Sequence, residues 1–429
     1  MDAFQYTNGQ LCCEALLVAD IVAQAGSPVY IYSKATLLDH YQKLATSFAP
    51  VDTTVCFSIK CLSNLSILKL LKDAGSGFDV VSGGELARAM AIGADPQKIV
   101  YAGVGKTDAE IRYALECNIG WFNIESEMEF ETISRIAGEM GVTTRAALRI
   151  NPDVYDPKTH AYTTTGKKET KFGVDIDRAE EFFERFGRDD NVTLDSIHLH
   201  IGSPIYSAAP YVAALNKALV FIDAIRARGM EINVLDLGGG FAADYETGKS
   251  PLAADYAAEI LPLVQQANVK LILEPGRHIA CNAGLLATKI LYTKIGGEKK
   301  FLIADAAMTD LLRPALYQAE HFVYPVNLPD GAAVPEHKLD FAPDGGETVD
   351  IVGGVCETSD TLAHARCLPP MTRGDLLAIF GAGAYGFVMA SNYNTRPRPA
   401  EVLVDGDSFK IVRPRETVEE IFAPEIDCL

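Results

Sequence analysis

The stretch Val55-Cys56-Phe57-Ser58-Ile59-Lys60 decides the fold, because seven later segments of the chain repeat its pattern. A short apolar run rich in β-branched and aromatic residues is typical of a buried strand. The polar residues 61–66 that follow indicate the start of a helix. A lysine at this junction either reaches solvent or lies in a pocket where desolvation makes its amine nucleophilic. For a single lysine the solvent-exposed alternative is the common one.

Eight such apolar segments alternate with helical patterns. The predicted strands are residues 55–60, 77–82, 98–102, 121–124, 145–151, 196–201, 234–237 and 270–273. Near-continuous apolar strands separated by helices predict parallel strands that are buried on both faces. Eight units over roughly 225 residues fit a closed (β/α)8 barrel of the TIM type, whose usual size is about 250. An open doubly wound sheet is the alternative.

The pattern changes after Arg277, where short β-type segments with Pro and Gly turns replace most of the helical patterns. We therefore predict an α/β protein with two domains. Residues 28–277 form the barrel. Residues 1–27 and 278–429 together form an all-β domain, resembling a Greek-key barrel or sandwich.

Composition excludes several classes of protein. A formal net charge of −19 argues against nucleic acid and anionic membranes as partners. No run of about 18 apolar residues could span a membrane, and the N-terminus has no basic region of a signal peptide. Nine cysteines without a Cys-x-x-Cys pair indicate reduced thiols, and hence a cytoplasmic protein.

In a barrel, functional side chains gather where strands run into the following loops. Chemically active residues stand at nearly all of the predicted strand ends, which predicts a single site at that rim. They are Lys60, Asp79, Glu125, Arg149, His198, His200, Gly238-Gly239-Gly240, Glu274 and Arg277.

Two of these groups have more than one interpretation. The three glycines could turn backbone N–H groups towards a phosphate, or could simply form a tight turn. His198 and His200 face the same way on a strand and could be two metal ligands, but no third ligand stands at a recognisable spacing. We therefore expect no metal, and instead a ring that packs against an aromatic ligand or a core histidine.

The combination of a strand-end lysine, a glycine turn, a histidine and an acid is what pyridoxal 5'-phosphate requires. Lys60 would hold the cofactor covalently, Gly238–Gly240 would hold the phosphate, and His200 would lie on the ring face. Glu274 would keep the ring nitrogen protonated, so that the ring accepts electrons. A G-x-G-x-x-G match at 381–386 lies in the β-rich region and does not support a dinucleotide fold.

The sequence resembles the barrel-type (fold-type III, alanine-racemase-like) pyridoxal-phosphate decarboxylases and, within them, the diaminopimelate decarboxylase family. The matching motifs run in order from about residue 27 to 390 and cover nearly the whole chain. They include Phe57-Ser58-Ile59-Lys60, Phe78-Asp79-Val80-Val81-Ser82-Gly83-Gly84-Glu85, His198-Leu199-His200-Ile201-Gly202-Ser203, Gly238-Gly239-Gly240, Glu274-Pro275-Gly276-Arg277, Arg313-Pro314-Ala315-Leu316-Tyr317, Cys356-Glu357-Thr358-Ser359-Asp360 and Gly383-Ala384-Tyr385. The segment 313–317 is the discriminating one.

The resemblance implies a role for each matching residue. The cofactor would be bound by Lys60, Asp79, His200, Gly238, Gly239, Gly240, Glu274, Gly276, Arg277 and Tyr385. The distal carboxylate of the substrate would be bound by Arg277, Arg313 and Tyr317, and its distal ammonium by Glu357; Tyr385 would contact both cofactor and substrate. Cys356 would protonate the carbon that loses CO₂. Cys356 and Glu357 would come from the neighbouring subunit, which implies a homodimer with shared active sites.

The implied reaction is the decarboxylation of meso-2,6-diaminopimelate to L-lysine and CO₂, the last step of lysine synthesis. A decarboxylase of another basic amino acid (ornithine, lysine or a D-isomer), a racemase and a non-catalytic homologue are the alternatives. The sequence departs from the family pattern at three places, where Cys61-Leu62 replaces Ala-Asn, Pro204 replaces Gln and Ser359 replaces Gly. They bear on fine specificity and leave the cofactor assignment intact.

Overall fold

The computed structural model describes residues 3–154, 171–426 and 428–429. The chain divides into two compact units. The barrel unit comprises His40–Ala242 and Pro251–His278, and the β unit comprises Met1–Asp39, Ala243–Ser250 and Ile279–Leu429. Helix α2 (Lys34–Phe48) begins in the β unit and ends in the barrel unit.

The barrel unit contains a closed ring of eight parallel strands, as the sequence predicts. In order around the ring the strands are β9 (Thr144–Asn151), β11 (Val192–His198), β12 (Val234–Asp236), β13 (Lys270–Leu273), β5 (Thr53–Ser58), β6 (Gly77–Val80), β7 (Ile99–Tyr101) and β8 (Trp121–Ile124). The pairing of β8 with β9 closes the ring, and the two-residue β10 (Val174–Asp175) pairs parallel with the end of β9. This closure excludes the open-sheet alternative.

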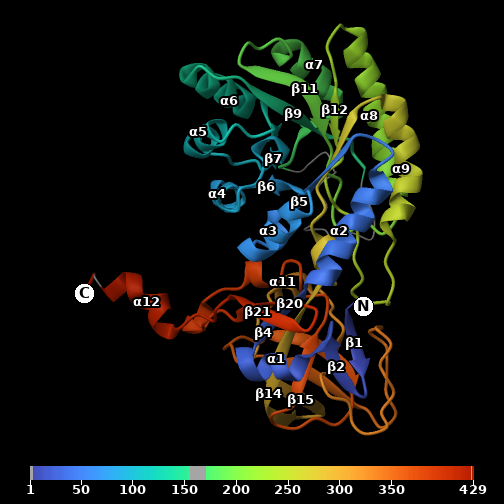
Figure 1. Cartoon of the computed structure of the whole chain (residues 1–429), viewed down its shortest axis with the longest axis vertical. Coiled ribbons are helices and arrows are strands. Elements are labelled where there is room, and N and C mark those ends of the chain that lie inside the picture. The colour runs from blue at the N-terminus through green and yellow to red at the C-terminus, as the bar shows by residue number, and fades with distance from the viewer. Residues whose placement is uncertain (1–2, 155–170, 427) are drawn as a thin grey trace. The chain divides into compact units, whose positions relative to one another are not determined.

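Helices surround these strands (Figure 1). They are α3 (Leu65–Asp73), α4 (Gly83–Ala91), α5 (Asp108–Glu116), α6 (Glu127–Met140), α7 (Ile176–Phe186), α8 (Ala209–Ala227) and α9 (Ala253–Ala267). Ser82, Thr107 and Ser126 cap three of them by accepting a hydrogen bond from the amide three residues later. Such caps satisfy amides that a helix start leaves unpaired, so each helix begins at a defined residue after its strand.

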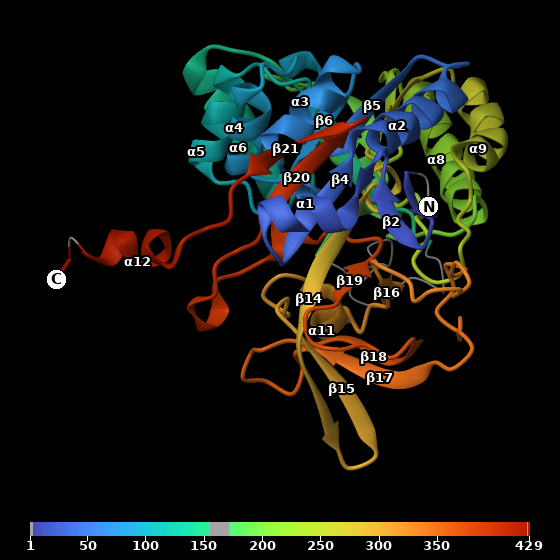
Figure 2. The same cartoon turned by 60° about the horizontal axis from the view of Figure 1, so that its bottom comes forward.

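The β unit is built on a mixed sheet in the order β18 (Thr361–Leu368), β17 (Glu347–Val352), β15 (Lys299–Ala304), β14 (Gly284–Gly296), β4 (Val29–Ser33), β20 (Ala400–Asp405) and β21 (Ser408–Arg413). Strand β19 (Leu376–Ile379) pairs with β14 and with β16 (Val323–Pro325), and β1 (Phe4–Thr7), β2 (Gln10–Cys13) and β3 (Leu16–Leu17) form a separate small sheet. Figure 2 shows β14 running out into its hairpin with β15. The unit also holds the short helices α1 (Val18–Ala25), α11 (Arg313–Tyr317) and α12 (Val418–Ile426), and α10 (Arg277–Ala280) crosses the division between the two units.

The division of the chain differs from the predicted boundaries at residues 28–39 and 243–250, which lie in the β unit. The reason is clear for β4. Its five residues are all buried, and it pairs antiparallel with β14 and parallel with β20. An apolar strand near the N-terminus suits either domain, and only its pairing partners decide which one it joins. Among the described residues, no helix combines the length and apolar character needed to cross a bilayer.

Candidate active site

Five neighbouring strands carry the predicted cofactor residues of the barrel unit. In ring order, His200 follows β11, Gly238–Gly240 follow β12, Glu274 to Arg277 follow β13, Lys60 follows β5, and Asp79 lies in β6. Because neighbouring parallel strands end at the same rim, residues from positions 60 to 277 come together there. The predicted gathering of strand-end residues is therefore a property of the fold.

Lys60 forms an ion pair. Its Nζ lies 2.5 Å from Asp79 Oδ2, and Ser58 Oγ donates to the same oxygen at 2.6 Å. The Asp79 side chain is fully buried and that of Lys60 is 32% exposed. Burial, and then the charge of Glu274, raise the pKa of Asp79 above its ordinary value, although Lys60 opposes the shift. Lys60 is therefore held against a buried acid rather than extended into solvent.

The three glycines form a turn that admits no side chain. Gly238 and Gly240 have φ values of +68° and +101°. A Cβ on Gly239 would lie 2.3 Å from the carbonyl oxygen of Glu274, and one on Gly240 would lie 2.3 Å from that of Gly202. Only glycine fits such positions, because both the backbone conformation and the close approach exclude a Cβ.

Two of the glycine amides are committed to protein side chains. Gly238 N–H donates to Asp236 Oδ1 at 2.9 Å, and Gly239 N–H donates to His200 Nδ1 at 3.2 Å. The tight-turn interpretation accounts for these two amides. The phosphate contact of Gly238–Gly240 stays a prediction, and the first two amides of the turn have side-chain acceptors in this structure.

His200 is held as a neutral ring. Desolvation, and then the nearby cations Arg149 and Lys60, lower its pKa well below the ordinary value. Its Nδ1 accepts the Gly239 N–H, so the ring proton lies on Nε2. A neutral imidazole with a fixed orientation can pack against an aromatic ring without carrying a charge to it.

Glu274 is buried beside three polar side chains. Asn123 Nδ2 donates to Glu274 Oε1 at 3.0 Å and to Asp236 Oδ2 at 3.2 Å. His198 Nε2 lies 3.4 Å from Glu274 Oε2. Burial would raise the pKa of Glu274, but the neighbouring His198 and Lys60 outweigh it and hold the pKa below its usual range. Glu274 is therefore an ionised acid inside the barrel.

The metal hypothesis paired His198 with His200, and the structure groups these two residues differently. Ligand atoms of His198, Asp236 and Glu274 lie within 4.8 Å of one another, whereas His200 is bonded to Gly239. Three potential ligands therefore do lie together, but the two acids come from other strands than His198, so the spacing in the sequence did not show them.

Arg277 and Gly276 complete the turn after β13. Arg277 is 7% exposed, and its Nε donates to Ser203 Oγ at 3.3 Å. A Cβ on Gly276 would lie 3.0 Å from Cys61 Sγ and 3.1 Å from Ser58 Cβ. The unusual Cys61 therefore packs directly under the Gly276 turn and is itself buried.

The remaining predicted residues lie in the β unit. Arg313 begins α11, is 8% exposed, and lies over the ring of Tyr245 with 4.4 Å between the guanidinium carbon and the ring centroid. His321 Nε2 accepts from Arg313 Nη1 at 2.9 Å, and its Nδ1 donates to the carbonyl of Phe380. Tyr317 ends the same helix. Two aromatic side chains thus fix the direction of the guanidinium.

Cys356 and Glu357 lie in an exposed loop of the β unit. Glu357 accepts hydrogen bonds from Tyr393 Oη at 2.7 Å and from the unusual Ser359 at 3.0 Å, and these bonds lower its pKa. The buried Asp360 accepts from the amides of Met308 and Val355 at 2.6 and 2.7 Å, which fixes the loop. The predicted residue Tyr385 is half-buried, with a φ of +56°.

The barrel residues fit pyridoxal phosphate. They offer an amine beside a buried acid, a side-chain-free turn, a neutral ring and an ionised carboxylate, all at the ends of neighbouring strands. Sequence reasoning missed Asn123 and Asp236. Asp236 had a weak signal, since it stands two residues before the glycines, whereas Asn123 lies within an apolar strand and had none.

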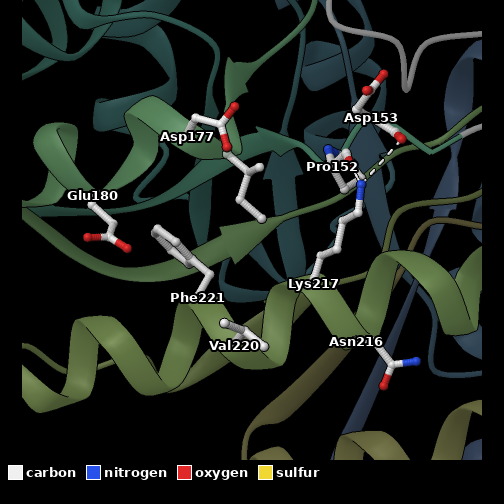
Figure 3. A pocket seen from close by; sticks show the side chains of 9 residues that line it. Pro152, Asp153, Asp177, Glu180, Asn216, Lys217, Val220 and Phe221 are labelled. Carbon is white, nitrogen blue, oxygen red and sulfur yellow. Dashed lines mark hydrogen bonds between the residues drawn. The ribbon is translucent and has the colours of Figure 1, made fainter.

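A separate hollow of about 540 Å³ lies between α7, α8 and the end of β9 (Figure 3). It is lined by Pro152, Asp153, Ile176, Asp177, Glu180, Asn216, Lys217, Val220 and Phe221. Lys217 Nζ points to the carbonyl of Pro152 and donates to it at 2.6 Å. None of the predicted site residues lines this hollow.

Comparison with known proteins agrees with the geometry. The family described as "Pyridoxal-dependent decarboxylase, pyridoxal binding domain" matches residues 34–281. The diaminopimelate decarboxylase of Vibrio cholerae is 44% identical over 427 residues, covering 99% of this chain and 99% of that protein. The diaminopimelate decarboxylase of Pseudomonas aeruginosa is 44% identical over 425 residues, with the same coverage of both chains.

Solved structures give the same result. The crystal structure of diaminopimelate decarboxylase from Helicobacter pylori complexed with L-lysine matches with a TM-score of 0.89 at 37% identity, covering 96% of this chain and 100% of that one. A lysine/ornithine decarboxylase from Vibrio vulnificus shares only the fold, with a TM-score of 0.77 at 19% identity, 91% of this chain and 97% of that one being covered. The chain belongs to the diaminopimelate decarboxylase family of the pyridoxal-dependent decarboxylases.

Proposed function

We propose that this protein decarboxylates meso-2,6-diaminopimelate to L-lysine and CO₂ with pyridoxal phosphate as cofactor. The observation that carries the proposal is the set of side chains at the ends of β12, β13, β5 and β6, namely the glycine turn, Glu274, Lys60 and its partner Asp79. Full-length identity of 44% to diaminopimelate decarboxylases supports the choice of substrate.

The cofactor, when bound, supplies an electron sink for the bond that breaks at the substrate α-carbon. Lys60 would hold it, Glu274 would offer a negative charge to its ring nitrogen, and neutral His200 would pack against its ring. Asp79, Gly238, Gly239, Gly240, Gly276, Arg277 and Tyr385 complete the cofactor set. The fixed charges need no reorganisation during the reaction, because they are buried and already hydrogen-bonded.

The substrate residues are those that the family resemblance implies. Arg277, Arg313 and Tyr317 bind the distal carboxylate, Glu357 binds the distal ammonium, and Tyr385 contacts the substrate. Arg313 suits this task because Tyr245 and His321 hold its guanidinium in one direction. Two arginines supply positive charge in a chain whose net charge is −19, which favours a substrate with a second carboxylate over a basic amino acid such as ornithine or lysine.

The protein acts as a homodimer in the cytoplasm, and each active site takes Cys356 and Glu357 from the partner subunit. Cys356 then delivers a proton to the α-carbon after CO₂ leaves. Its exposure in a loop fixed by Asp360 suits a group that serves another chain. All nine cysteines lie in the described part of the chain and none forms a disulfide, as expected in a reducing compartment.

Incubation of the purified protein with single amino acids and measurement of CO₂ release tests the substrate. We expect release from meso-diaminopimelate and little from ornithine, lysine or arginine, which have no distal carboxylate for the arginines. Arg313→Ala should raise the KM for diaminopimelate more than it lowers kcat, because it removes binding of a remote group. Preference for ornithine or lysine in the wild type would replace this proposal with the alternative decarboxylase.

A further inference from the structure

Four barrel strands direct polar side chains into one buried cluster. Asn123 comes from β8, His198 from β11 and Asp236 from β12, and Glu274 follows β13. Their residues are 0%, 1%, 1% and 3% exposed, respectively. Burying two acids, an amide and an imidazole together costs free energy, because each polar group loses its hydration.

One amide group joins the two acids. Asn123 Nδ2 donates one hydrogen bond to Asp236 Oδ2 and another to Glu274 Oε1, at 3.2 and 3.0 Å. The other oxygen of Asp236 accepts the Gly238 N–H at 2.9 Å. Asp236 therefore connects the first glycine of the turn to the acid that faces the predicted ring nitrogen.

The pair cannot carry two negative charges. Two carboxyl groups that share a buried site repel each other when both are ionised, so one of them keeps a proton. The nearest positive or proton-donating groups favour ionisation of Glu274, since His198 Nε2 lies 3.4 Å from its Oε2 and Lys60 also acts on it. Burial, and then the charge of Glu274, raise the pKa of Asp236 well above its usual value. Cys56 and Asp79 are the other titratable groups that interact with the pair.

A metal ion is a weaker explanation for the same cluster. His198, Asp236 and Glu274 have ligand atoms within 4.8 Å of one another. However, an oxygen of each acid already accepts a hydrogen bond from Asn123, and this donor amide would face the cation. A shared proton satisfies both acids and keeps the amide hydrogen bonds.

We propose that Asp236 is a positioning residue that carries the proton shared with Glu274 and so keeps Glu274 the ionised acid of the site. The hydroxyl of Asp236 donates to Glu274, its carbonyl oxygen accepts from Gly238, and Asn123 holds the two carboxyl groups in register. This rests on the proposed function, in which Glu274 faces the ring nitrogen of pyridoxal phosphate. Asp236 itself touches neither cofactor nor substrate.

Infrared spectroscopy of the apoprotein tests the shared proton without the cofactor. At neutral pH the wild type should show the carbonyl stretch of a protonated carboxylic acid, and Asp236→Asn should lose this component. Asp195→Asn is the matched control, because Asp195 is a β11 carboxylate paired with Arg145 at 2.7 Å, and it should leave the band unchanged. An unchanged band in Asp236→Asn means that Asp236 is ionised and overturns the proposal.

Titration of the apoproteins with pyridoxal phosphate tests the consequence. Asp236→Asn still offers a donor to Glu274, although its amide faces that of Asn123, so its affinity should stay within about threefold of the wild type. Asp236→Ala offers none and should bind at least about tenfold more weakly. Nitrogen NMR of labelled cofactor should show a protonated ring nitrogen in the wild type and in Asp236→Asn.

Equal losses in the two variants would overturn the positioning role. Asp236→Asn has nearly the shape of the native residue, so it gives a result even if the Ala variant does not fold. A wild type that does not bind pyridoxal phosphate would contradict the proposed function instead, while the infrared result would still decide whether Asp236 carries the proton.

Discussion

The amine of Lys60 lies 2.5 Å from the buried carboxylate of Asp79. The two residues are 19 positions apart; Lys60 follows β5 and Asp79 lies in the neighbouring parallel strand β6, and the two strands align Ser58 with Asp79. Ser58 Oγ donates to the same carboxylate oxygen and to the carbonyl of Glu274. The lysine is thus oriented by a small network within the barrel, which is what a residue that bonds a cofactor needs.

Lys60 should hold pyridoxal phosphate covalently. The purified protein should absorb visible light, and borohydride reduction should fix the cofactor on a peptide that contains Lys60. Lys60→Ala should lose the labelled peptide and more than about a thousandfold of turnover, because covalent catalysis is removed. Mass spectrometry locates the label. Labelling of another lysine, such as Lys106, would contradict the assignment.

Glu274→Gln should lower kcat far more than it raises KM. The amide keeps the shape and an acceptor for Asn123, but removes the negative charge that stabilises a protonated ring nitrogen. We expect a loss of at least about a hundredfold in kcat, because the charge matters most as electrons move into the ring. Steady-state kinetics at saturating cofactor measures both constants. A variant with near-native turnover would disprove this role.

Gly239→Ala should destabilise the barrel. Its Cβ would lie 2.3 Å from the carbonyl oxygen of Glu274, so backbone must move, at a cost of about 1–3 kcal/mol in the free energy of unfolding. Gly105→Ala is the control, because no atom lies within 4 Å of its Cβ and it should change stability by less than about 0.5 kcal/mol. Denaturant unfolding compares them. Equal stability of the two variants would show that the turn yields easily.

Glu85 should make stability fall as pH rises. Burial, and secondarily the charge of Asp79, raise the pKa of Glu85 from 4.5 in the unfolded chain to about 7 in the folded protein. The hydrogen bond from the Val81 N–H lowers the pKa but does not outweigh burial. Between pH 4.5 and 7 the folded protein holds a proton that the unfolded chain has lost. The contribution of Glu85 to the free energy of unfolding is therefore complete below pH 4.5 and is lost as pH rises through 7. Glu85→Gln should remove this slope and keep an acceptor for Val81.

Glu110→Gln is the control, because Glu110 contributes a dependence of stability on pH that has the opposite sign. Amides of Gly83 and Thr107 lower the Glu110 pKa to about 2, so its contribution is present above 4.5 and is lost as pH falls towards 2. The variant should therefore differ from the wild type in pH dependence only at acidic pH. Denaturant unfolding across the pH range measures both slopes, and a Glu85→Gln profile that parallels the wild type would refute the prediction.

Cys356 should serve the active site of the partner subunit. Cys356→Ala should still bind the cofactor covalently but lose most CO₂ release, because protonation and not binding is removed. Mixing it with Lys60→Ala protomers should restore about a quarter of wild-type activity, since half of the dimers regain one of two sites. No recovery, with subunit exchange shown independently, would mean that Cys356 acts in its own chain.

Much of the fold could be predicted from the sequence. Eight apolar segments of strand length, separated by helical patterns, allow few arrangements other than a parallel barrel, because a strand buried on both faces needs helices outside it. The barrel in turn places strand ends at one rim. Lys60, Asp79, Glu274 and the glycines could therefore be named before any contact was known.

Other features could not be predicted. The strand at 29–33 is equally apolar in either domain, and its pairing with β14 and β20 places it in the β unit. A run of three glycines likewise does not reveal that the Gly238 and Gly239 amides donate hydrogen bonds to Asp236 and His200.

The sequence by itself determined the barrel and the family and predicted the lysine that binds the cofactor, because strand periodicity and local motifs depend on residues close together in the chain. Only the tertiary structure decided that Asn123 meets Asp236 and Glu274, which stand 113 and 151 positions away. Contacts of this kind depend on which strands the closed ring brings face to face. The charge of Glu274 follows from those contacts, because a buried acid takes its ionisation from the groups that enclose it.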